Sequence, residues 1–218
     1  MTISANIEEI KNELPPSTRL VAVSKFKPAE DIIEAYNSGL REFGENRPQE
    51  MQMKAQTLPS DIKWHFIGHL QTNKVKMIID KAYLIHSVDS VKLAQEIDRQ
   101  ASLRSITKDC LLQIHIAMEE TKQGFTSAEI RESIDILKSL KNIRICGVMG
   151  MASYVSERDQ IRKEFAALKS EFDFLKETYF RDSECFKEVS MGMSGDYRIA
   201  IEEGSTIVRI GTGIFGVR

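Results

Sequence analysis

The stretch Leu20-Val-Ala-Val-Ser24-Lys25 is a short apolar run that ends on a polar pair. A nearly continuous apolar run containing valines is typical of a parallel strand that is buried on both faces. Pro28 follows where an amphipathic segment begins, in a position of a helix that tolerates its missing N–H, and Gly39 follows that segment as a natural C-cap. The stretch therefore predicts a buried strand followed by a helix, with Lys25 at the carboxyl end of the strand.

The same alternation repeats along the whole chain. Short apolar runs lie at residues 20–23, 42–45, 64–67, 83–88, 110–116, 143–149, 187–190 and 206–210. A helix carrying Ile7, Ile10 and Leu14 is expected before the first run, and Pro48 is expected at the start of a later helix. The alternation indicates eight strand–helix units.

Two of the expected helices carry particularly clear signals. Thr126 and Glu129 have the spacing of a capping box, which begins a helix. A later segment has apolar residues at spacings of three and four, which places them on one face of a helix: Ile161, Phe165, Leu168, Phe172 and Leu175. Such a face is wide enough to pack on a sheet.

Eight units in 218 residues predict an α/β fold, a single (β/α)₈ TIM barrel with an extra N-terminal helix. A doubly wound open sheet is the alternative, although it usually has fewer strands. We find no linker or low-complexity segment, so residues 1–218 are expected to form one domain. Both folds bind ligands at the carboxyl ends of their strands. Those ends are Ser24–Lys25, Glu45–Asn46, Gly68, Ser190–Ser194 and Gly211–Thr212.

The composition excludes several classes of protein. A hydrophobic fraction of 42% and a charged fraction of 28% are ordinary for a globular protein, and a net charge of −2 provides no basic field for nucleic acid or an anionic membrane. The N-terminus lacks the apolar core of a signal peptide, and no segment is as apolar as a membrane helix. Three widely spaced cysteines indicate reduced thiols. We therefore expect a cytoplasmic protein.

Lys25 is the first candidate for chemistry. A lysine at the end of a buried strand is either an ordinary side chain that reaches solvent or a Schiff-base lysine. The second role requires a neutral amine, and partial burial at the mouth of a barrel favours that state.

Two glycine-rich segments are candidates for a phosphate site. The dinucleotide fingerprint G-x-G-x-x-G is present as Gly211-Thr-Gly-Ile-Phe-Gly216. A dinucleotide site would require a long helix after it, and this segment comes after the last expected strand with too few residues left for one. Loops after the last two strands of a barrel frequently bind phosphate, and Ser190-Met-Gly-Met-Ser194-Gly195 supplies two hydroxyls there. Glycines that only form tight turns remain the alternative.

The histidines and cysteines do not indicate a metal site. On an extended strand His65 and His69 would lie about 13 Å apart, too far to share an ion. His86 and His115 fall in apolar runs and are expected to be hydrogen-bonded core residues. Cys110 and Cys146 are expected to be inert core thiols, and no serine lies in a nucleophile elbow.

Taken together, these segments resemble the pyridoxal phosphate homeostasis family, over essentially residues 15 to 218. The matching segments are Val21-Ala-Val-Ser-Lys25-Phe-Lys27-Pro, Phe43-Gly-Glu-Asn46-Arg-Pro-Gln-Glu50, Trp64-His-Phe-Ile-Gly68-His-Leu-Gln71-Thr-Asn73-Lys74, Lys122-Gln-Gly124-Phe, Gly147-Val-Met-Gly-Met151, Ser190-Met-Gly-Met-Ser194-Gly-Asp196 and Gly204-Ser-Thr-Ile-Val-Arg209-Ile-Gly-Thr212-Gly-Ile-Phe-Gly216. Arg47-Pro48 departs from the pattern of many members, at no cofactor contact.

The resemblance implies a barrel related to the N-terminal domain of alanine racemase that binds pyridoxal 5′-phosphate (PLP). It implies an internal aldimine on Lys25 and a pyridine nitrogen that faces Arg209. Asn46 would lie near the ring. The phosphate would be held by Ser190, Ser194, Gly211 and Thr212.

Two functions remain open at this point. One is a non-catalytic PLP protein of vitamin B6 homeostasis, which affects amino-acid and keto-acid balance and for which apo PLP-dependent enzymes are possible recipients. The other is an amino-acid racemase or related PLP enzyme. Alanine racemases use a second, β-rich domain with another base, and this chain ends at the barrel, so the resemblance favours the first. We expect a monomer with no metal, nucleic-acid or membrane partner.

Overall fold

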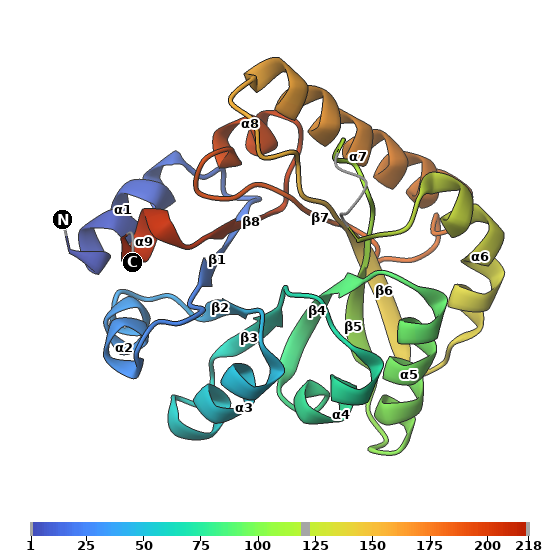
Figure 1. The fold of residues 1–218 in the computed structure, drawn as a ribbon, viewed down its shortest axis with the longest axis horizontal. Coiled ribbons are helices and arrows are strands. Elements are labelled where there is room, and N and C mark those ends of the chain that lie inside the picture. The colour runs from blue at the N-terminus through green and yellow to red at the C-terminus, as the bar shows by residue number, and fades with distance from the viewer. Residues whose placement is uncertain (1, 119–122, 217–218) are drawn as a thin grey trace.

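A computed structural model describes residues 2–118 and 123–216 of the chain as a closed barrel of parallel strands surrounded by helices (Figure 1). The strands pair in sequence order and β8 closes on β1. They are β1 (Arg19–Val23), β2 (Glu42–Glu45), β3 (Lys63–Phe66), β4 (Ala82–Val88), β5 (Lys108–Gln113), β6 (Ile143–Met149), β7 (Glu188–Ser190) and β8 (Ile207–Ile210). The prediction of a (β/α)₈ barrel is confirmed.

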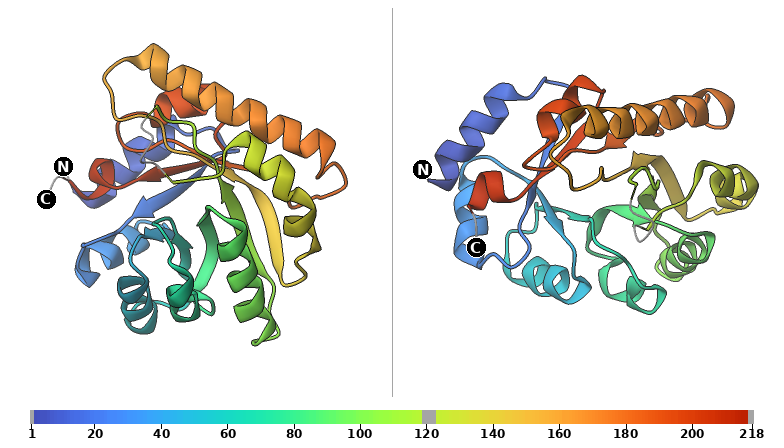
Figure 2. Two further views of the ribbon diagram at one scale, coloured as in Figure 1. Left: turned by 45° about the vertical axis from the view of Figure 1, so that its right-hand side comes forward. Right: turned by 45° about the horizontal axis from the view of Figure 1, so that its top comes forward.

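The helices form a ring outside the strands, as the turned views in Figure 2 also show. They are α1 (Ile3–Glu13), α2 (Ala29–Asn37), α3 (Pro48–Thr57), the 3₁₀ turn η1 (Thr72–Lys74), α4 (Val75–Ile78), α5 (Val91–Ser102), α6 (Ser127–Ser139), α7 (Arg158–Thr178), α8 (Tyr197–Glu202) and α9 (Thr212–Phe215). Helix α1 is the extra N-terminal helix. It lies beside α9, where the Asn6 amide donates a hydrogen bond to the carbonyl of Ile214 at 2.9 Å.

Local signals in the sequence place most helix ends correctly. The capping box of Thr126 and Glu129 is present at the start of α6. Pro48 occupies the first turn of α3, whereas Pro28 is the N-cap of α2, one residue before its first helical position. Gly39 follows α2 with a φ of +85°, a left-handed conformation that glycine adopts without strain.

Most of the buried apolar side chains lie between the helices and the outer wall of the barrel. The predicted face of α7 is part of this layer, and Phe165, Leu168 and Leu175 are fully buried there. A second, smaller apolar cluster fills the barrel interior: Val21, Leu84, Leu111, Cys146, Met149 and Ile207. Buried polar side chains of the strands also lie in the interior, among them His65, His86, Ser190 and Arg209. The interior is therefore partly polar.

Candidate functional site

The strand ends that the sequence singles out lie close together on one side of the barrel. Strands β7, β8, β1 and β2 are consecutive neighbours around the barrel. Lys25 follows β1, Asn46 follows β2, and Gly211 and Thr212 follow β8, while Ser190 ends β7 and Ser194 lies in the next loop. The fold thus brings these residues to one part of the C-terminal mouth.

Lys25 lies on a tight turn that its neighbours hold in place. The N–H of Lys27 donates to the carbonyl of Ser24 at 3.0 Å, and Phe26 has a φ of +62°, in the left-handed region. The N–H of Phe26 donates to Glu50 Oε1 at 2.6 Å. Lys25 itself is half-buried, and its amine has no hydrogen-bond or ion-pair partner among the described residues. The turn is fixed while the amine stays available.

A buried ionic cluster of Glu45, Lys54 and Glu50 holds this turn in place. Glu45 Oε1 accepts hydrogen bonds from Ser24 Oγ at 2.6 Å and from Lys54 Nζ at 2.8 Å. Lys54 also donates to the carbonyl of Ser24 at 2.7 Å and to Glu50 at 2.7 Å. Burial raises the pKa of Glu45, against the opposing effects of Lys54 and Ser24. The sequence analysis did not single out Glu50 and Lys54. They are four residues apart in the helix that begins at Pro48, so both lie on one face of α3.

The neighbouring lysines are placed differently from Lys25. Lys27 Nζ donates to the carbonyl of Phe215 at 3.0 Å, which ties the turn to α9. Lys74 lies in η1, after β3. Lys122 lies outside the described residues.

Arg209 is a buried cation inside the barrel. Its side chain donates to Ser190 Oγ at 2.6 Å and to the carbonyl of Gly150 at 3.0 Å, and only 3% of the residue is exposed. Burial lowers the pKa of Arg209 to about 10, so the guanidinium still carries its charge at neutral pH. Ser190 is fully buried, and its hydroxyl lies between Arg209 and His86. The distance from Ser190 Oγ to His86 Nδ1 is 2.9 Å.

Backbone N–H groups and hydroxyls converge after β7 and β8. Ser194 Oγ accepts hydrogen bonds from the N–H groups of Gly211 and Gly213, each at 3.2 Å. Gly211 is the N-cap of α9 and Thr212 its first residue. A Cβ on Gly211 would lie 3.3 Å from the carbonyl oxygen of Val23, so this loop packs against the end of β1. Ser194 Oγ occupies both N–H groups in this structure, and together they form a cluster of polar groups of the kind that binds anions.

Asn46 carries an unsatisfied polar atom at the same mouth. Its Oδ1 is buried and has no hydrogen-bond partner among the described residues. Gly68 lies directly against it, because a Cβ on Gly68 would come within 2.4 Å of both the Cβ and the carbonyl oxygen of Asn46. Gly68 therefore permits a close approach that fixes Asn46.

The other sequence candidates lie away from this cluster. His86 is a buried, hydrogen-bonded residue as predicted, while His115 lies beyond the end of β5 and is only half-buried. His69 contacts Asp89 at 3.1 Å near the surface. Within residues 2–118 and 123–216, no group of three His, Cys, Asp or Glu residues could hold a metal ion.

The cysteines are free thiols. Cys110 and Cys146 are buried as predicted, and Cys185 is half-buried. Burial raises the pKa of Cys110 and raises that of Cys146 to about 12, so both stay protonated at neutral pH.

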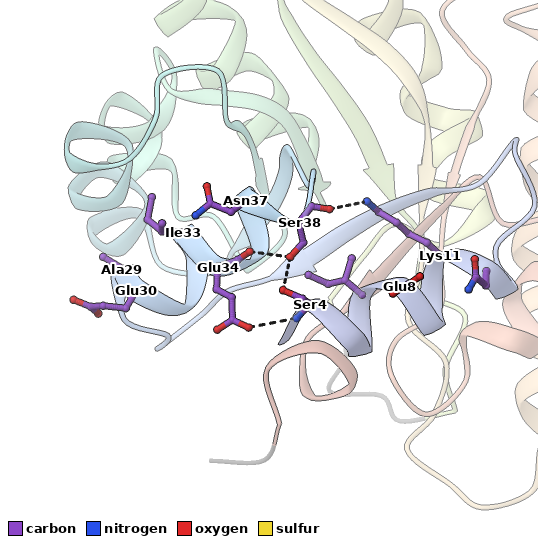
Figure 3. A pocket seen from close by; sticks show the side chains of 11 residues that line it. Ser4, Glu8, Lys11, Ala29, Glu30, Ile33, Glu34, Asn37 and Ser38 are labelled. Atoms are coloured by element: carbon purple, nitrogen blue, oxygen red, sulfur yellow. Dashed lines mark hydrogen bonds between the residues drawn. The ribbon is translucent and has the colours of Figure 1, made fainter. Parts of the chain in front are cut away.

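A cavity of about 930 Å³ lies between α1 and α2 (Figure 3). Its polar groups bond to one another. Ser4 Oγ lies 2.7 Å from Ser38 Oγ, and Lys11 Nζ donates to the carbonyl of Ser38 at 3.3 Å. This cavity is a gap between two packed helices, and the mouth around Lys25 remains the candidate site.

Comparisons with known proteins identify the family to which this chain is similar. Residues 1–218 match the family model described as "Alanine racemase, N-terminal domain". The chain is 42% identical over 201 residues to the pyridoxal phosphate homeostasis protein of Aquifex aeolicus, covering 92% of this chain and 87% of that one. It is 41% identical over 212 residues to the protein of that name from Synechocystis, covering 96% of each.

Solved structures of related proteins have the same fold. PipY of Synechococcus elongatus, solved with PLP bound, has a TM-score of 0.90 and 35% identity, over 99% of this chain and all of that one. An alanine racemase of Clostridium difficile has a TM-score of 0.77 at 16% identity, and this chain covers 57% of it, so that likeness concerns the fold alone.

Proposed function

This chain belongs to the pyridoxal phosphate homeostasis protein family, and from that premise we propose that it binds PLP as a non-catalytic protein of vitamin B6 homeostasis. One observation supports this most directly. The amine of Lys25, which has no partner among the described residues, lies on a fixed turn at the same mouth as the polar cluster of Ser194, Gly211 and Gly213. An aldehyde that carries a phosphate requires both features.

The residues present fit PLP, and each has a proposed role. Lys25 attacks the aldehyde carbon and forms a covalent imine link with loss of one water. Ser194, Gly211 and Thr212 hold the phosphate through hydroxyl and backbone N–H groups. Asn46, whose Oδ1 has no partner within the described part of the chain, bonds near the ring, and Arg209 donates toward the pyridine nitrogen. The Ser190 hydroxyl is enclosed between Arg209 and His86, so we assign it to holding Arg209 instead of the phosphate.

Arg209 also supplies the reason to propose that the protein is not an enzyme. PLP stabilises a carbanion best when its pyridine nitrogen is protonated, because the ring then accepts electrons. Arg209, with a pKa of about 10, donates a hydrogen bond and keeps its proton at neutral pH. The nitrogen that it faces therefore stays unprotonated. Aldimine exchange with amines needs no such electron sink.

Borohydride reduction of the yellow holoprotein followed by peptide mapping tests the covalent link. We expect the label on Lys25, loss of the imine absorbance in Lys25→Ala, and retention of both in Lys27→Ala. Lys27 is the matched control because its amine is held by the carbonyl of Phe215. A label on Lys27, Lys74 or Lys122 would refute the assignment.

A second experiment separates the carrier from the alternative enzyme. Holoprotein is incubated with L-alanine, and D-alanine and pyruvate are followed. We expect neither to form at an enzymatic rate; turnover that Lys25→Ala abolishes would establish a racemase or transaminase instead.

The remaining parts of the proposal concern partners and location. We propose that apo PLP-dependent enzymes receive the cofactor, and that residues 1–218 act as one cytoplasmic, monomeric domain. Among the described helices, none is long and apolar enough to cross a bilayer. Measuring PLP transfer from the holoprotein to several apoenzymes, compared with free PLP at the same concentration, would identify recipients. Sedimentation velocity would give the oligomeric state.

A further inference from the structure

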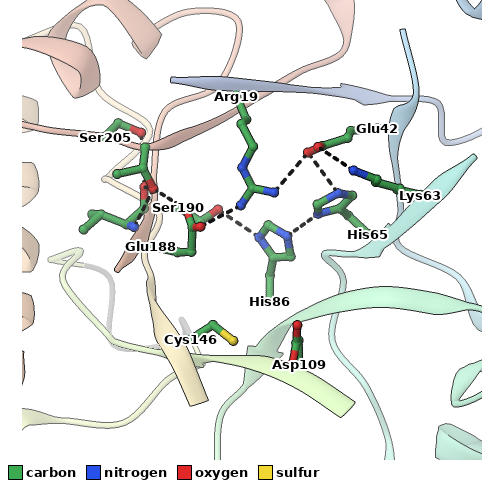
Figure 4. Close-up of polar contacts among 12 residues, drawn as sticks. Arg19, Glu42, Lys63, His65, His86, Asp109, Cys146, Glu188, Ser190 and Ser205 are labelled. Atoms are coloured by element: carbon green, nitrogen blue, oxygen red, sulfur yellow. Dashed lines mark hydrogen bonds and ion pairs between the residues drawn. The ribbon is translucent and has the colours of Figure 1, made fainter. Parts of the chain in front are cut away.

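A row of buried polar side chains runs from Arg209 through the barrel to the opposite mouth, and Figure 4 shows the part of it from Ser190 to Glu42. Arg209 donates to Ser190 Oγ, which lies 2.9 Å from His86 Nδ1. His86 Nε2 lies 2.8 Å from His65 Nδ1. The remaining nitrogen of His65, Nε2, faces Glu42 Oε2 at 3.3 Å, an ion-pair contact that lacks hydrogen-bond geometry in the structure. His65, His86 and Ser190 are fully buried.

The chemistry of its two ends gives this row a direction. A guanidinium only donates and a carboxylate only accepts, so Ser190 accepts from Arg209. If Ser190 then donates to His86 Nδ1, His86 carries its proton on Nε2 and donates to His65 Nδ1. His65 in turn carries its proton on Nε2, toward Glu42. Every proton from Arg209 to His65 Nδ1 then has an acceptor, and the proton on His65 Nε2 faces the Glu42 carboxylate.

The opposite direction fails at both ends. His86 and Arg209 would then both donate to Ser190, and the Ser190 proton would lose its acceptor in the row. His65 would present a lone pair to the Glu42 carboxylate, which is repulsive. Only one arrangement of protons satisfies the row.

The charges agree with this arrangement. Burial lowers the pKa of His65, and lowers that of His86 well below its usual value, so both imidazoles are neutral at neutral pH. Partial burial raises the pKa of Glu42, but His65, Arg19 and Lys63 outweigh it and the pKa lies below the usual value. The row therefore begins on a buried cation and ends on a carboxylate, with neutral groups between.

We propose that Ser190, His86, His65 and Glu42 are positioning residues for PLP: a one-directional hydrogen-bond chain that holds Arg209 and gives its buried charge a relayed acceptor in Glu42. This inference rests on the proposed function. The hydrogen bonds from Arg209 to Ser190 and Gly150 go to neutral groups. The chain polarises Ser190 so that it accepts more strongly, and the guanidinium stays aimed at the pyridine nitrogen.

The first test uses the PLP-free wild-type protein and measures the imidazole ¹⁵N shifts at neutral pH. We expect His65 and His86 to be neutral and protonated on Nε2. A proton on Nδ1 of either residue, or a charged imidazole, would overturn the chain.

The second test compares two glutamates of the same mouth, both of which pair with Arg19. Glu42 lies 3.4 Å from the Arg19 guanidinium and Glu188 lies 3.1 Å from it, but Glu188 is outside the row. We expect Glu42→Gln to raise the Kd for PLP about fivefold to tenfold, because a neutral amide accepts more weakly than a carboxylate. Glu188→Gln should stay within about twofold of wild type, since it removes the same charge without touching the chain.

The outcomes separate this inference from the function on which it rests. Equal effects of the two substitutions would show that only the local charge matters and would refute the relay. Wild-type protein that does not bind PLP would refute the proposed function, and the imidazole shifts would then decide alone whether the chain exists.

Discussion

The two mouths of this barrel are built from similar residue types but differ in how those residues are satisfied. At the N-terminal mouth, charged residues near the strand starts surround a cavity of about 640 Å³, and several of them pair with one another. Arg19 contacts Glu42 and Glu188, and Arg144 contacts Asp109. At the C-terminal mouth, the amine of Lys25 and Oδ1 of Asn46 lack partners among the described residues.

This difference supports the proposal that the ligand binds at the C-terminal mouth. A charge that is already paired gains little from a new partner, whereas an unsatisfied polar group near an anion site gains a hydrogen bond. The N-terminal mouth of a barrel commonly serves stability and the C-terminal mouth serves chemistry. This assignment would be wrong if a substitution at the N-terminal mouth changed ligand binding, or if one at the C-terminal mouth changed only stability.

Removing the phosphate from the ligand should have the largest effect. Each hydrogen bond to a charged group contributes roughly 1.5–3 kcal/mol, so losing two or three should weaken binding about a thousandfold. Pyridoxal and PLP are titrated into the apoprotein, and the absorbance of the imine is followed.

A substitution in the phosphate loop provides the control for that measurement. Ser194→Ala should weaken PLP binding while leaving pyridoxal binding nearly unchanged, because only PLP reaches that loop. Equal affinities of wild type for PLP and pyridoxal would show that the donors of Gly211 and Ser194 serve the fold alone.

Local signals in the sequence predicted the fold because buried parallel strands are continuous apolar runs and the helices between them carry one apolar face. The prediction was wrong where a tertiary contact decides the end of a strand. The run at residues 110–116 continues in sequence, but β5 ends at Gln113 and Ile114 forms an isolated bridge with Phe125. That partner lies beyond the end of the run, so periodicity could not show it.

The candidate site was predictable only where a polar residue directly follows an apolar run. Strand-end polarity singled out Lys25, Asn46 and Gly211, and only the family resemblance named PLP and gave Arg209 its role. The support under the turn and the row through the barrel were missed. His65 and His86 come from different strands, and only the closed barrel brings their rings within hydrogen-bond distance.

Acid should reveal the row that joins the two mouths. The unfolded chain takes up protons on His65 and His86 below pH 6.5, while burial holds their folded pKa values lower. Stability therefore falls as the pH drops below 6.5, by about 1.4 kcal/mol per pH unit for each histidine until its folded pKa is reached. Both histidines contribute to this loss, and urea unfolding at pH 6.5 and pH 5.5 measures it.

His86→Gln tests the origin of that loss. The amide can still bond to Ser190 and His65 but does not titrate, so the loss of stability between pH 6.5 and pH 5.5 should become smaller. An unchanged slope would mean that other groups cause the acid sensitivity.

Gly68→Ala should disturb the C-terminal mouth by steric contact. The added Cβ would come within 2.4 Å of the backbone oxygen of Asn46, and overpacking of this kind costs about 1–3 kcal/mol. Displacing Asn46 should also weaken PLP binding. Gly195→Ala is the matched control for stability, since a Cβ there meets nothing within 4 Å. If Gly68→Ala unfolds at the same urea concentration as wild type, the close contact is not maintained in solution.

Arg144→Ala should have the smallest effect, and its direction tests the N-terminal mouth. Arg144 pairs with Asp109 through contacts of 2.6 and 2.8 Å, but more than half of its side chain is exposed. Exposed pairs contribute about 0.2–1 kcal/mol and are weakened by salt. We expect a stability loss in that range that shrinks as salt is added, and no change in PLP affinity. A cycle with Asp109→Ala isolates the pair from other contacts. If Arg144→Ala weakened PLP binding, the N-terminal mouth would be coupled to the cofactor through more than Glu42, and the division between the two mouths would not hold.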